Sequence, residues 1–179
     1  MGVDKATITL GGTTLLARAV AHLDEVCDPV LIAPGDTATT LDGRQSVTDA
    51  VRDAGPLGGV VAALRASPHL LLTVVAVDLP WIDPRLLQLL AGVIGDADVA
   101  VCETAGGVEP LHAVYATSIL EEAEAALAGP DRSLRGLIAR VKARRVPESE
   151  WRAAGISERF ARNLNTPEDV AAVSPETLR

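Results

Sequence analysis

Residues 70–80 read Leu-Leu-Leu-Thr-Val-Val-Ala-Val-Asp-Leu-Pro, and this stretch decides the fold class. Its first eight residues are apolar except for Thr73, which predicts a strand that is buried on both faces of a sheet. Apolar residues recur with helical spacing at 13–23 and 58–67 before it and at 83–94 after it. Strands that alternate with helices predict an α/β fold with a mostly parallel sheet covered on both faces.

The rest of the chain continues this alternation. The spacing predicts further strands over 30–33, 45–48, 98–103, 111–116 and 161–164, and further helices over 118–128 and 133–143. The stretch around Trp151 reads as irregular. Because no repeat, low-complexity tract or linker divides the sequence, we predict a single domain over residues 1–179.

Composition excludes several classes of protein. The chain has 16 Lys and Arg against 24 Asp and Glu, a net charge of −8, whereas nucleic-acid binders need a basic surface. No apolar run approaches the ~18–20 residues that span a bilayer, and the N-terminus lacks an apolar signal segment. Cys27 and Cys102 lie far apart in the sequence and have no C-x-x-C spacing. Two lone cysteines of this kind are most often small buried side chains in a protein of a reducing compartment. These features predict a cytoplasmic protein with neither a nucleic-acid nor a membrane partner.

Asp78 is the first candidate functional residue. Ligands of open α/β sheets bind outside the carboxyl ends of the strands, and Asp78 directly follows the apolar run. A carboxylate at that place suits Mg²⁺ beside a phosphate chain. An aspartate that only caps a turn explains the same position.

Two further stretches suit phosphate binding. Lys5, just ahead of the first apolar run, would neutralise a phosphate as a point charge, although a solvated terminal lysine is the simpler interpretation. Residues 55–59, Gly-Pro-Leu-Gly-Gly, open a helix, where glycines let backbone N–H groups approach a ligand. A plain tight turn explains them equally. The chain contains no G-x-G-x-x-G run, which argues against a dinucleotide-binding dehydrogenase.

The C-terminal stretch 163–169, Asn-Leu-Asn-Thr-Pro-Glu-Asp, predicts a helix start. Asn165 or Thr166 suffices as the cap, so capping does not require Asn163. The three histidines lack metal-ligand spacing, which argues against a zinc site, and only His112 has an arguable place near a site. The absence of a G-x-S-x-G motif argues against a common hydrolase.

Taken together, five short segments resemble the molybdenum cofactor guanylyltransferases, in that family's order. They are Met1–Lys5, Gly55–Gly59, Asp78–Pro80, Pro110–Tyr115 and Asn163–Glu168. The resemblance covers the chain nearly end to end and implies a three-layer, Rossmann-like nucleotidyltransferase fold. It also implies the reaction: GMP passes from GTP to molybdenum-molybdopterin, giving the guanine dinucleotide cofactor and pyrophosphate.

The resemblance also implies roles for individual residues. Lys5 and Asp78 would be the catalytic pair, with Lys5 on the nucleotide phosphates and Asp78 holding Mg²⁺. The nucleotide side would be formed by Asp49, for which Asp53 is a rival, and by Gly55 and Gly59. The pterin side would be formed by Arg132, Asn163 and Asn165. The implied partners are GTP, the molybdopterin cofactor and other proteins of its biosynthesis.

The chain also departs from the family pattern. Family members have a buried strand and a glycine-rich loop ahead of the segment at which this sequence begins, so the resemblance implies a sheet that lacks its first central strand. We expect Lys5 and Asp78 to face an open site. Ala33-Pro34 also stands where family members often have Asn. Two interpretations stay open: a start codon assigned too late, or a truncated paralogue without transferase activity.

Three other functions remain as alternatives. The first is a related nucleotidyltransferase that uses CTP or a sugar-phosphate acceptor. The second is a non-catalytic paralogue that acts as an interaction protein. The third, a flavodoxin-like binding module, fits the alternation of strands and helices but explains none of the five segments.

Overall fold

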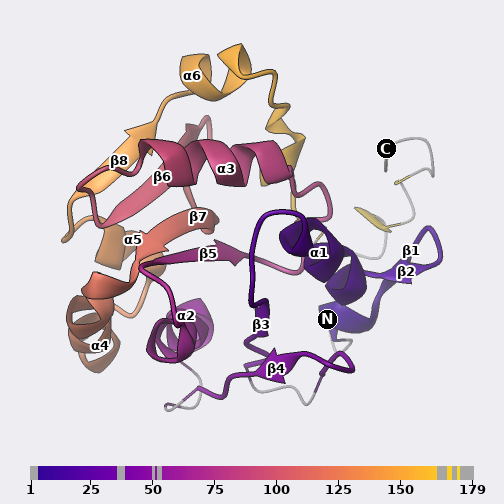
Figure 1. Cartoon of the computed structure of the whole chain (residues 1–179), viewed down its shortest axis with the longest axis horizontal. Coiled ribbons are helices and arrows are strands. Elements are labelled where there is room, and N and C mark those ends of the chain that lie inside the picture. The colour runs from indigo at the N-terminus through magenta and orange to yellow at the C-terminus, as the bar shows by residue number, and fades with distance from the viewer. Residues whose placement is uncertain are drawn as a thin grey trace.

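The main sheet of the molecule has four strands. The structure, a computed structural model, describes residues 4–35, 39–49, 51, 54–164, 169–170 and 173 (Figure 1). The strands are β5 (Leu71–Val75), β6 (Val99–Thr104), β7 (Gly107–Ala116) and β8 (Ala143–Val146), in the order β5-β7-β6-β8. Three of them run in one direction and β7 runs against them, so the sheet is mixed and the predicted predominance of parallel pairing is not found in it. Because β7 lies between β5 and β6, two of the three pairings are antiparallel.

Two small sheets lie outside the main one. β1 (Thr9–Leu10) and β2 (Thr13–Thr14) form a hairpin beside the 3₁₀ helix η1 (Lys5–Thr7). β3 (Leu31–Ile32) and β4 (Gln45–Ser46) pair in parallel. Within the described residues, no hydrogen-bonded pairing joins β3 to β5.

Helices cover both faces of the main sheet and complete the three predicted layers (Figure 1). One face packs against α2 (Gly55–Ala66), α4 (Leu120–Ala128), which η2 (Thr117–Ile119) precedes, and α5 (Leu134–Ile138). The other face packs against α3 (Pro84–Val93), α6 (Glu148–Ala153) and η3 (Glu158–Ala161). The remaining helix, α1 (Leu15–Asp24), is capped by Thr14, whose hydroxyl accepts from the Ala17 N–H. No helix of the described residues is long and apolar enough to cross a membrane.

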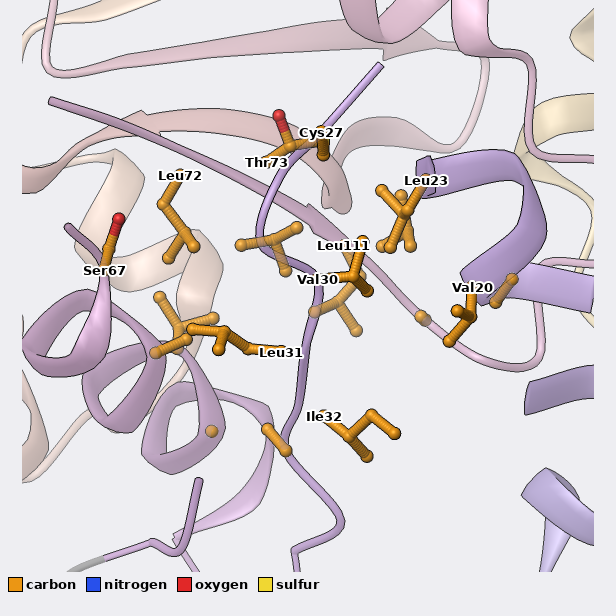
Figure 2. A pocket seen from close by; sticks show the side chains of 18 of the residues that line it. Val20, Leu23, Cys27, Val30, Leu31, Ile32, Ser67, Leu72, Thr73 and Leu111 are labelled. Atoms are coloured by element: carbon orange, nitrogen blue, oxygen red, sulfur yellow. The ribbon is translucent and has the colours of Figure 1, made fainter. Parts of the chain in front are cut away.

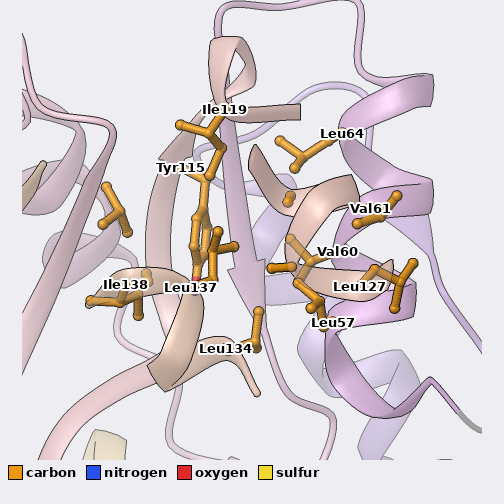
Figure 3. Close-up of a cluster of buried hydrophobic side chains, with 14 of the residues drawn as sticks. Leu57, Val60, Val61, Leu64, Tyr115, Ile119, Leu127, Leu134, Leu137 and Ile138 are labelled. Carbon is orange, nitrogen blue, oxygen red and sulfur yellow. The ribbon is translucent and has the colours of Figure 1, made fainter. Parts of the chain in front are cut away.

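Alternate residues of β6 supply the two cores. Val99 and Val101 belong to the cluster under α2, α4 and α5, whereas Ala100 and Cys102 belong to the cluster under α3 and α6. This is the period of two that a strand imposes. Figure 3 shows the first cluster, in which the Tyr115 ring lies among leucines, isoleucines and valines from the helices. Its hydroxyl donates to the Pro110 carbonyl at 2.7 Å, so the ring is buried without losing a hydrogen bond.

The second cluster contains a column of three rings. The His112 imidazole meets Phe160 edge-on, with centroids 5.2 Å apart, and Phe160 meets Trp151 in the same manner at 5.4 Å. All three residues are buried. The column therefore ties η3, and the C-terminal segment that follows it, to β7.

A cavity of about 680 Å³ separates β3 from β5 (Figure 2). Its walls are mainly apolar and come mostly from α1, β3, α2 and β5. The prediction that β5 is buried on both faces is wrong: Leu71 is 39% exposed and the other four residues are only partly buried. The side of β5 that faces away from β7 borders the cavity. The side chains of β5 therefore lack packing neighbours on that side. The expected gap in the central sheet is confirmed by this cavity between the two sheets.

Three predicted elements differ after residue 132. The helix predicted over 133–143 ends at Ile138, and residues 143–146 instead form β8, which pairs in parallel with β6. The free edge of β6 outweighs local helix propensity there, because the ladder buries Val146 completely. Trp151 lies in a helix, α6, and the strand predicted over 161–164 is the end of η3 followed by extended chain.

Burial of His112 predicts a specific loss of stability in acid. Burial lowers the pKa of His112 to about 4, so the folded state holds it neutral while the unfolded chain protonates near its ordinary pKa of 6.5. Relative to a His112→Phe variant, the unfolding free energy of the native chain should fall by about 3 kcal/mol between pH 6.5 and pH 4. Urea unfolding at several pH values measures this difference. Parallel pH profiles for the two proteins would contradict it.

Candidate active site

Lys5 and Asp78 meet at the carboxyl end of β5. The Lys5 Nζ donates to Asp78 Oδ2 at 2.8 Å, and the two side chains are 31% and 21% exposed. The structure thus brings together, across 73 positions of sequence, the two residues predicted as the catalytic pair. Both groups remain partly open to solvent and to a substrate.

Backbone contacts hold this pair in place. The Asp4 carboxylate caps η1 by accepting from the Ala6 N–H at 3.0 Å, and it also accepts from the Thr39 hydroxyl. On the other side, the Leu164 N–H donates to the Asp78 carbonyl at 2.9 Å. Asn163, the residue before Leu164, is exposed and lies beside Asp78 in the chain segment so anchored.

The glycine-rich turn opens α2 three residues earlier than predicted. Gly55 is the first helical residue, with a φ of 61° that side chains rarely adopt, and Pro56 occupies the first turn. A Cβ at Gly58 would lie 2.6 Å from Asp49 Oδ2, and one at Gly59 would lie 3.1 Å from the Ala33 Cβ. The glycines therefore make room for the Asp49 carboxylate at the start of the helix and for close packing against β3.

Of the remaining predicted site residues, one is described and is not brought into this group. Arg132 lies in the exposed loop before α5, and in the described part of the chain no hydrogen bond or ion pair joins it to Lys5 or Asp78. Asn165 and Asp53, the rival to Asp49, lie outside the described residues.

Sequence reasoning missed an aromatic and cationic cluster near Asp78. The guanidinium carbons of Arg162 and Arg159 lie 5.4 Å and 6.0 Å from the centre of the Trp81 ring. The contact joins residues about 80 positions apart, so no local motif signals it. The one available signal was a tryptophan three residues after Asp78. His112, by contrast, is a fully buried core residue.

The carboxylate at this edge suits a divalent metal ion. Mg²⁺ is usually held by one or two carboxylates together with substrate phosphates and water. Asp78 offers one partly exposed carboxylate, and the described residues contain no group of three or more His, Cys, Asp or Glu that could hold a metal ion without substrate. The donor set therefore suits an ion that arrives with a phosphate chain.

Several solved structures share the fold of this chain. One is the molybdopterin-guanine dinucleotide biosynthesis protein A from Archaeoglobus fulgidus, with a TM-score of 0.79 and 24% identity over 95% of this chain and 88% of that one. The Thermus thermophilus 2-C-methyl-D-erythritol 4-phosphate cytidylyltransferase has a TM-score of 0.70 and 18% identity over 93% and 90%. A Mycobacterium tuberculosis protein in complex with manganese has a TM-score of 0.64 and 23% identity over 82% of both chains.

Sequence comparison identifies the family. Residues 1–146 match the model of the MobA-like NTP transferase domain, and the chain belongs to this family. It is 35% identical to a probable molybdenum cofactor guanylyltransferase of Opitutus terrae, over 94% of this chain and 86% of that protein. It is 33% identical to the molybdenum cofactor guanylyltransferase of Cereibacter sphaeroides, over 95% and 86%. The resemblance inferred from the five segments is therefore confirmed.

Gly58→Ala should destabilise the site from within α2. Its Cβ would overlap both Ala54 and the Asp49 carboxylate at 2.6 Å. We expect a loss of about 1–3 kcal/mol in unfolding free energy, in spite of alanine's better helix propensity. The matched control is Gly92→Ala in α3, where the Cβ meets open space, and it should be neutral or stabilise by up to ~1 kcal/mol. Equal effects of the two changes on urea unfolding would refute the packing argument.

Proposed function

We propose that this chain transfers GMP from GTP to molybdopterin that carries molybdenum, giving the guanine dinucleotide cofactor and pyrophosphate. The observation that carries this proposal is the pair of Lys5 and Asp78 at the carboxyl end of β5, in a chain whose relatives are named molybdenum cofactor guanylyltransferases. The pair supplies one cation for phosphate oxygens and one hard oxygen ligand for a divalent ion.

The reaction is an in-line displacement at phosphorus. An oxygen of the acceptor phosphate forms a bond to the α-phosphorus of GTP, while the bond from that phosphorus to the oxygen bridging to the β-phosphate breaks. Pyrophosphate leaves with the electron pair of the broken bond. This displacement needs no covalent intermediate on the protein. The chain therefore contributes mainly by positioning the two substrates and by neutralising their charge.

Lys5 and Asp78 have different electrostatic roles. When the substrates bind, the Lys5 ammonium neutralises nucleotide phosphate oxygens while Asp78 holds Mg²⁺. The ion supplies charge neutralisation across the phosphate chain. The salt bridge that they form with each other keeps both groups at the edge of the sheet until then.

The nucleotide lies toward the start of α2. The first N–H groups of this 12-residue helix favour negative charge, and Gly55 and Gly59 let the nucleotide approach the backbone. The Asp49 carboxylate accepts hydrogen bonds from N–H or O–H groups of the nucleotide. The pterin lies toward Asn163 and Asn165, and the pterin-side role of Arg132 stays a prediction. The cytoplasmic location and the contacts with other biosynthetic proteins stay predictions.

Asp78→Asn tests the metal and catalytic role directly. The amide keeps the size of the side chain but loses its charge, so Mg²⁺-dependent release of pyrophosphate from GTP and molybdopterin should fall by about 100-fold or more. Asp96→Asn is the matched control, because Asp96 is exposed and pairs with Lys142 instead. An Asp78→Asn protein that stays folded and turns over at the native rate would remove Asp78 from this role.

The choice of nucleotide is tested with the same assay. CTP in place of GTP should give at most a small fraction of the pyrophosphate, as expected for a guanylyltransferase. A preference for CTP would favour the cytidylyl alternative, whose fold is shared by the Thermus thermophilus enzyme. No release with either nucleotide would favour the non-catalytic paralogue.

A further inference from the structure

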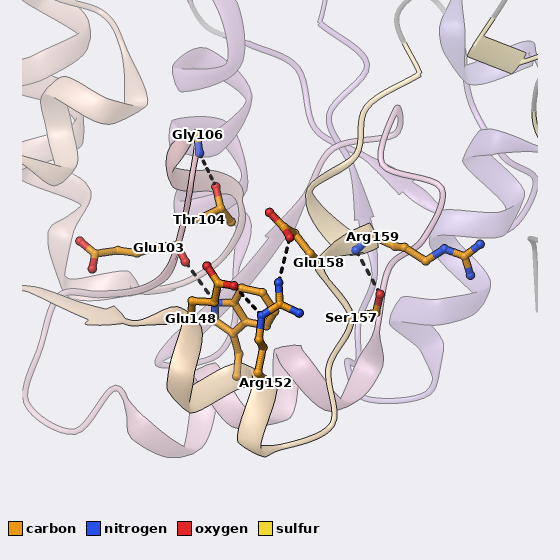
Figure 4. A network of polar contacts seen from close by, with 9 residues as sticks. Glu103, Thr104, Gly106, Glu148, Arg152, Ser157, Glu158 and Arg159 are labelled. Atoms are coloured by element: carbon orange, nitrogen blue, oxygen red, sulfur yellow. Dashed lines mark hydrogen bonds and ion pairs between the residues drawn. The ribbon is translucent and has the colours of Figure 1, made fainter.

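Two arginines beside Asp78 differ from most others in the chain. Seven arginines of the described residues form ion pairs with Asp or Glu: Arg44, Arg65, Arg85, Arg140, Arg144, Arg145 and Arg152. Arg159 and Arg162 are exposed, and neither guanidinium has a carboxylate partner within the described residues. In Figure 4 the Arg159 side chain extends away from the neighbouring network, in which Arg152 binds Glu148 and Glu158. In an acidic protein, two such cations are available for an anionic ligand.

Both guanidinium groups converge on one indole. Arg162 lies 5.4 Å and Arg159 6.0 Å from the Trp81 ring centre, within the range of cation–π attraction. This attraction orients the cations without consuming their N–H donors. We call Trp81, Arg159 and Arg162 the arginine–tryptophan platform.

The platform is fixed by the buried core below it. Phe160, between the two arginines in sequence, is 1% exposed and belongs to the column with His112 and Trp151. Trp81 packs against the cluster that contains Leu10, Leu15 and Leu164. The cations are therefore held by ordered backbone on both sides, which lowers the entropy cost of binding a ligand.

The platform and the glycine-rich turn belong to elements on opposite faces of the main sheet, because α2 packs on one face and η3, which contains Arg159, packs on the other. The turn at the start of α2 contacts Ala33, directly after β3. The two arginines of the platform flank Phe160, whose ring packs on His112 of β7. β7 pairs with β5, whereas β3 belongs to a separate sheet. An in-line transfer requires the acceptor to approach phosphorus from the side opposite to the leaving pyrophosphate. With the nucleotide at α2, the acceptor comes from the platform side.

We propose that the arginine–tryptophan platform binds the phosphate monoester of the acceptor and aims it at the α-phosphorus of GTP. This inference rests on the proposed function, since it assigns the second substrate of the same site. A phosphate monoester carries close to two negative charges, which two guanidinium forks neutralise with bidentate hydrogen bonds. Trp81 is a positioning residue that keeps the two forks in place.

Direct binding of molybdopterin without GTP tests the platform. Titration calorimetry should give an affinity that falls about 10- to 100-fold in an Arg159→Gln/Arg162→Gln double variant. Arg65→Gln, which breaks an exposed ion pair with Glu124 instead, is the matched control and should bind as the native chain does. Arg159→Lys/Arg162→Lys should recover part of the affinity, because lysine keeps the charge but not the fork. Thermal unfolding of each variant checks that it is folded.

The kinetic readout separates the two substrates. In the double variant the KM for molybdopterin should rise while the KM for GTP stays constant. Unchanged molybdopterin affinity would overturn the proposal, and so would a loss confined to GTP, since that would assign the platform to the nucleotide. Failure of the proposed function looks different: the native chain would bind molybdopterin through these arginines but release no pyrophosphate.

Discussion

β7 pairs with two strands at once, and each part of the site takes its position from that pairing. Its register against β5 places Leu111 where its carbonyl accepts from the Ala76 N–H at 2.9 Å, which fixes the point at which β5 ends and the chain turns to Asp78. One residue further along β7, the His112 ring holds Phe160 and so the C-terminal segment that returns to Asp78. A shift of this register by one residue would turn His112 to the opposite face and release that segment.

The parts of the site that were predictable are those with a local physical cause. Asp78 was predictable because a carboxylate ends an apolar strand, and Gly55 because only glycine tolerates the positive φ that begins α2. Lys5 became a candidate for catalysis only through the resemblance, since the sequence around it carries no signal of its own. β8 and the arginine–tryptophan platform were missed for the opposite reason: each exists through contacts with residues distant in sequence, the edge of β6 and the Trp81 ring.

The acidic composition proved a poor guide to the local electrostatics. A net charge of −8 describes the chain as a whole. Seven arginines of the described residues are already paired with carboxylates. Ion pairs at an exposed surface contribute little stability. The cations proposed to bind anionic substrates are of two kinds. Arg159 and Arg162 have no carboxylate partner within the described residues, and Lys5 pairs with Asp78 at the edge of the sheet. Under the proposed function, phosphate recognition would depend on which charges stay unneutralised, and the net charge of the chain carries no information about that.

In the proposed reaction, the two substrates would contact parts of the molecule that are held in place by different interactions. Asp78 follows a strand of the continuous hydrogen-bonded ladder, whereas α2 is held against that ladder by side-chain packing on one face of the sheet and beside the cavity between β3 and β5. A ladder fixes a discrete register, but packed side chains allow graded displacement. In the proposed reaction, the separation of donor and acceptor would therefore depend on residues such as Val60 and Ala63, which line the cavity from α2. Under the proposed function, a change of side-chain volume at these positions would alter the transfer distance and so couple core packing to turnover.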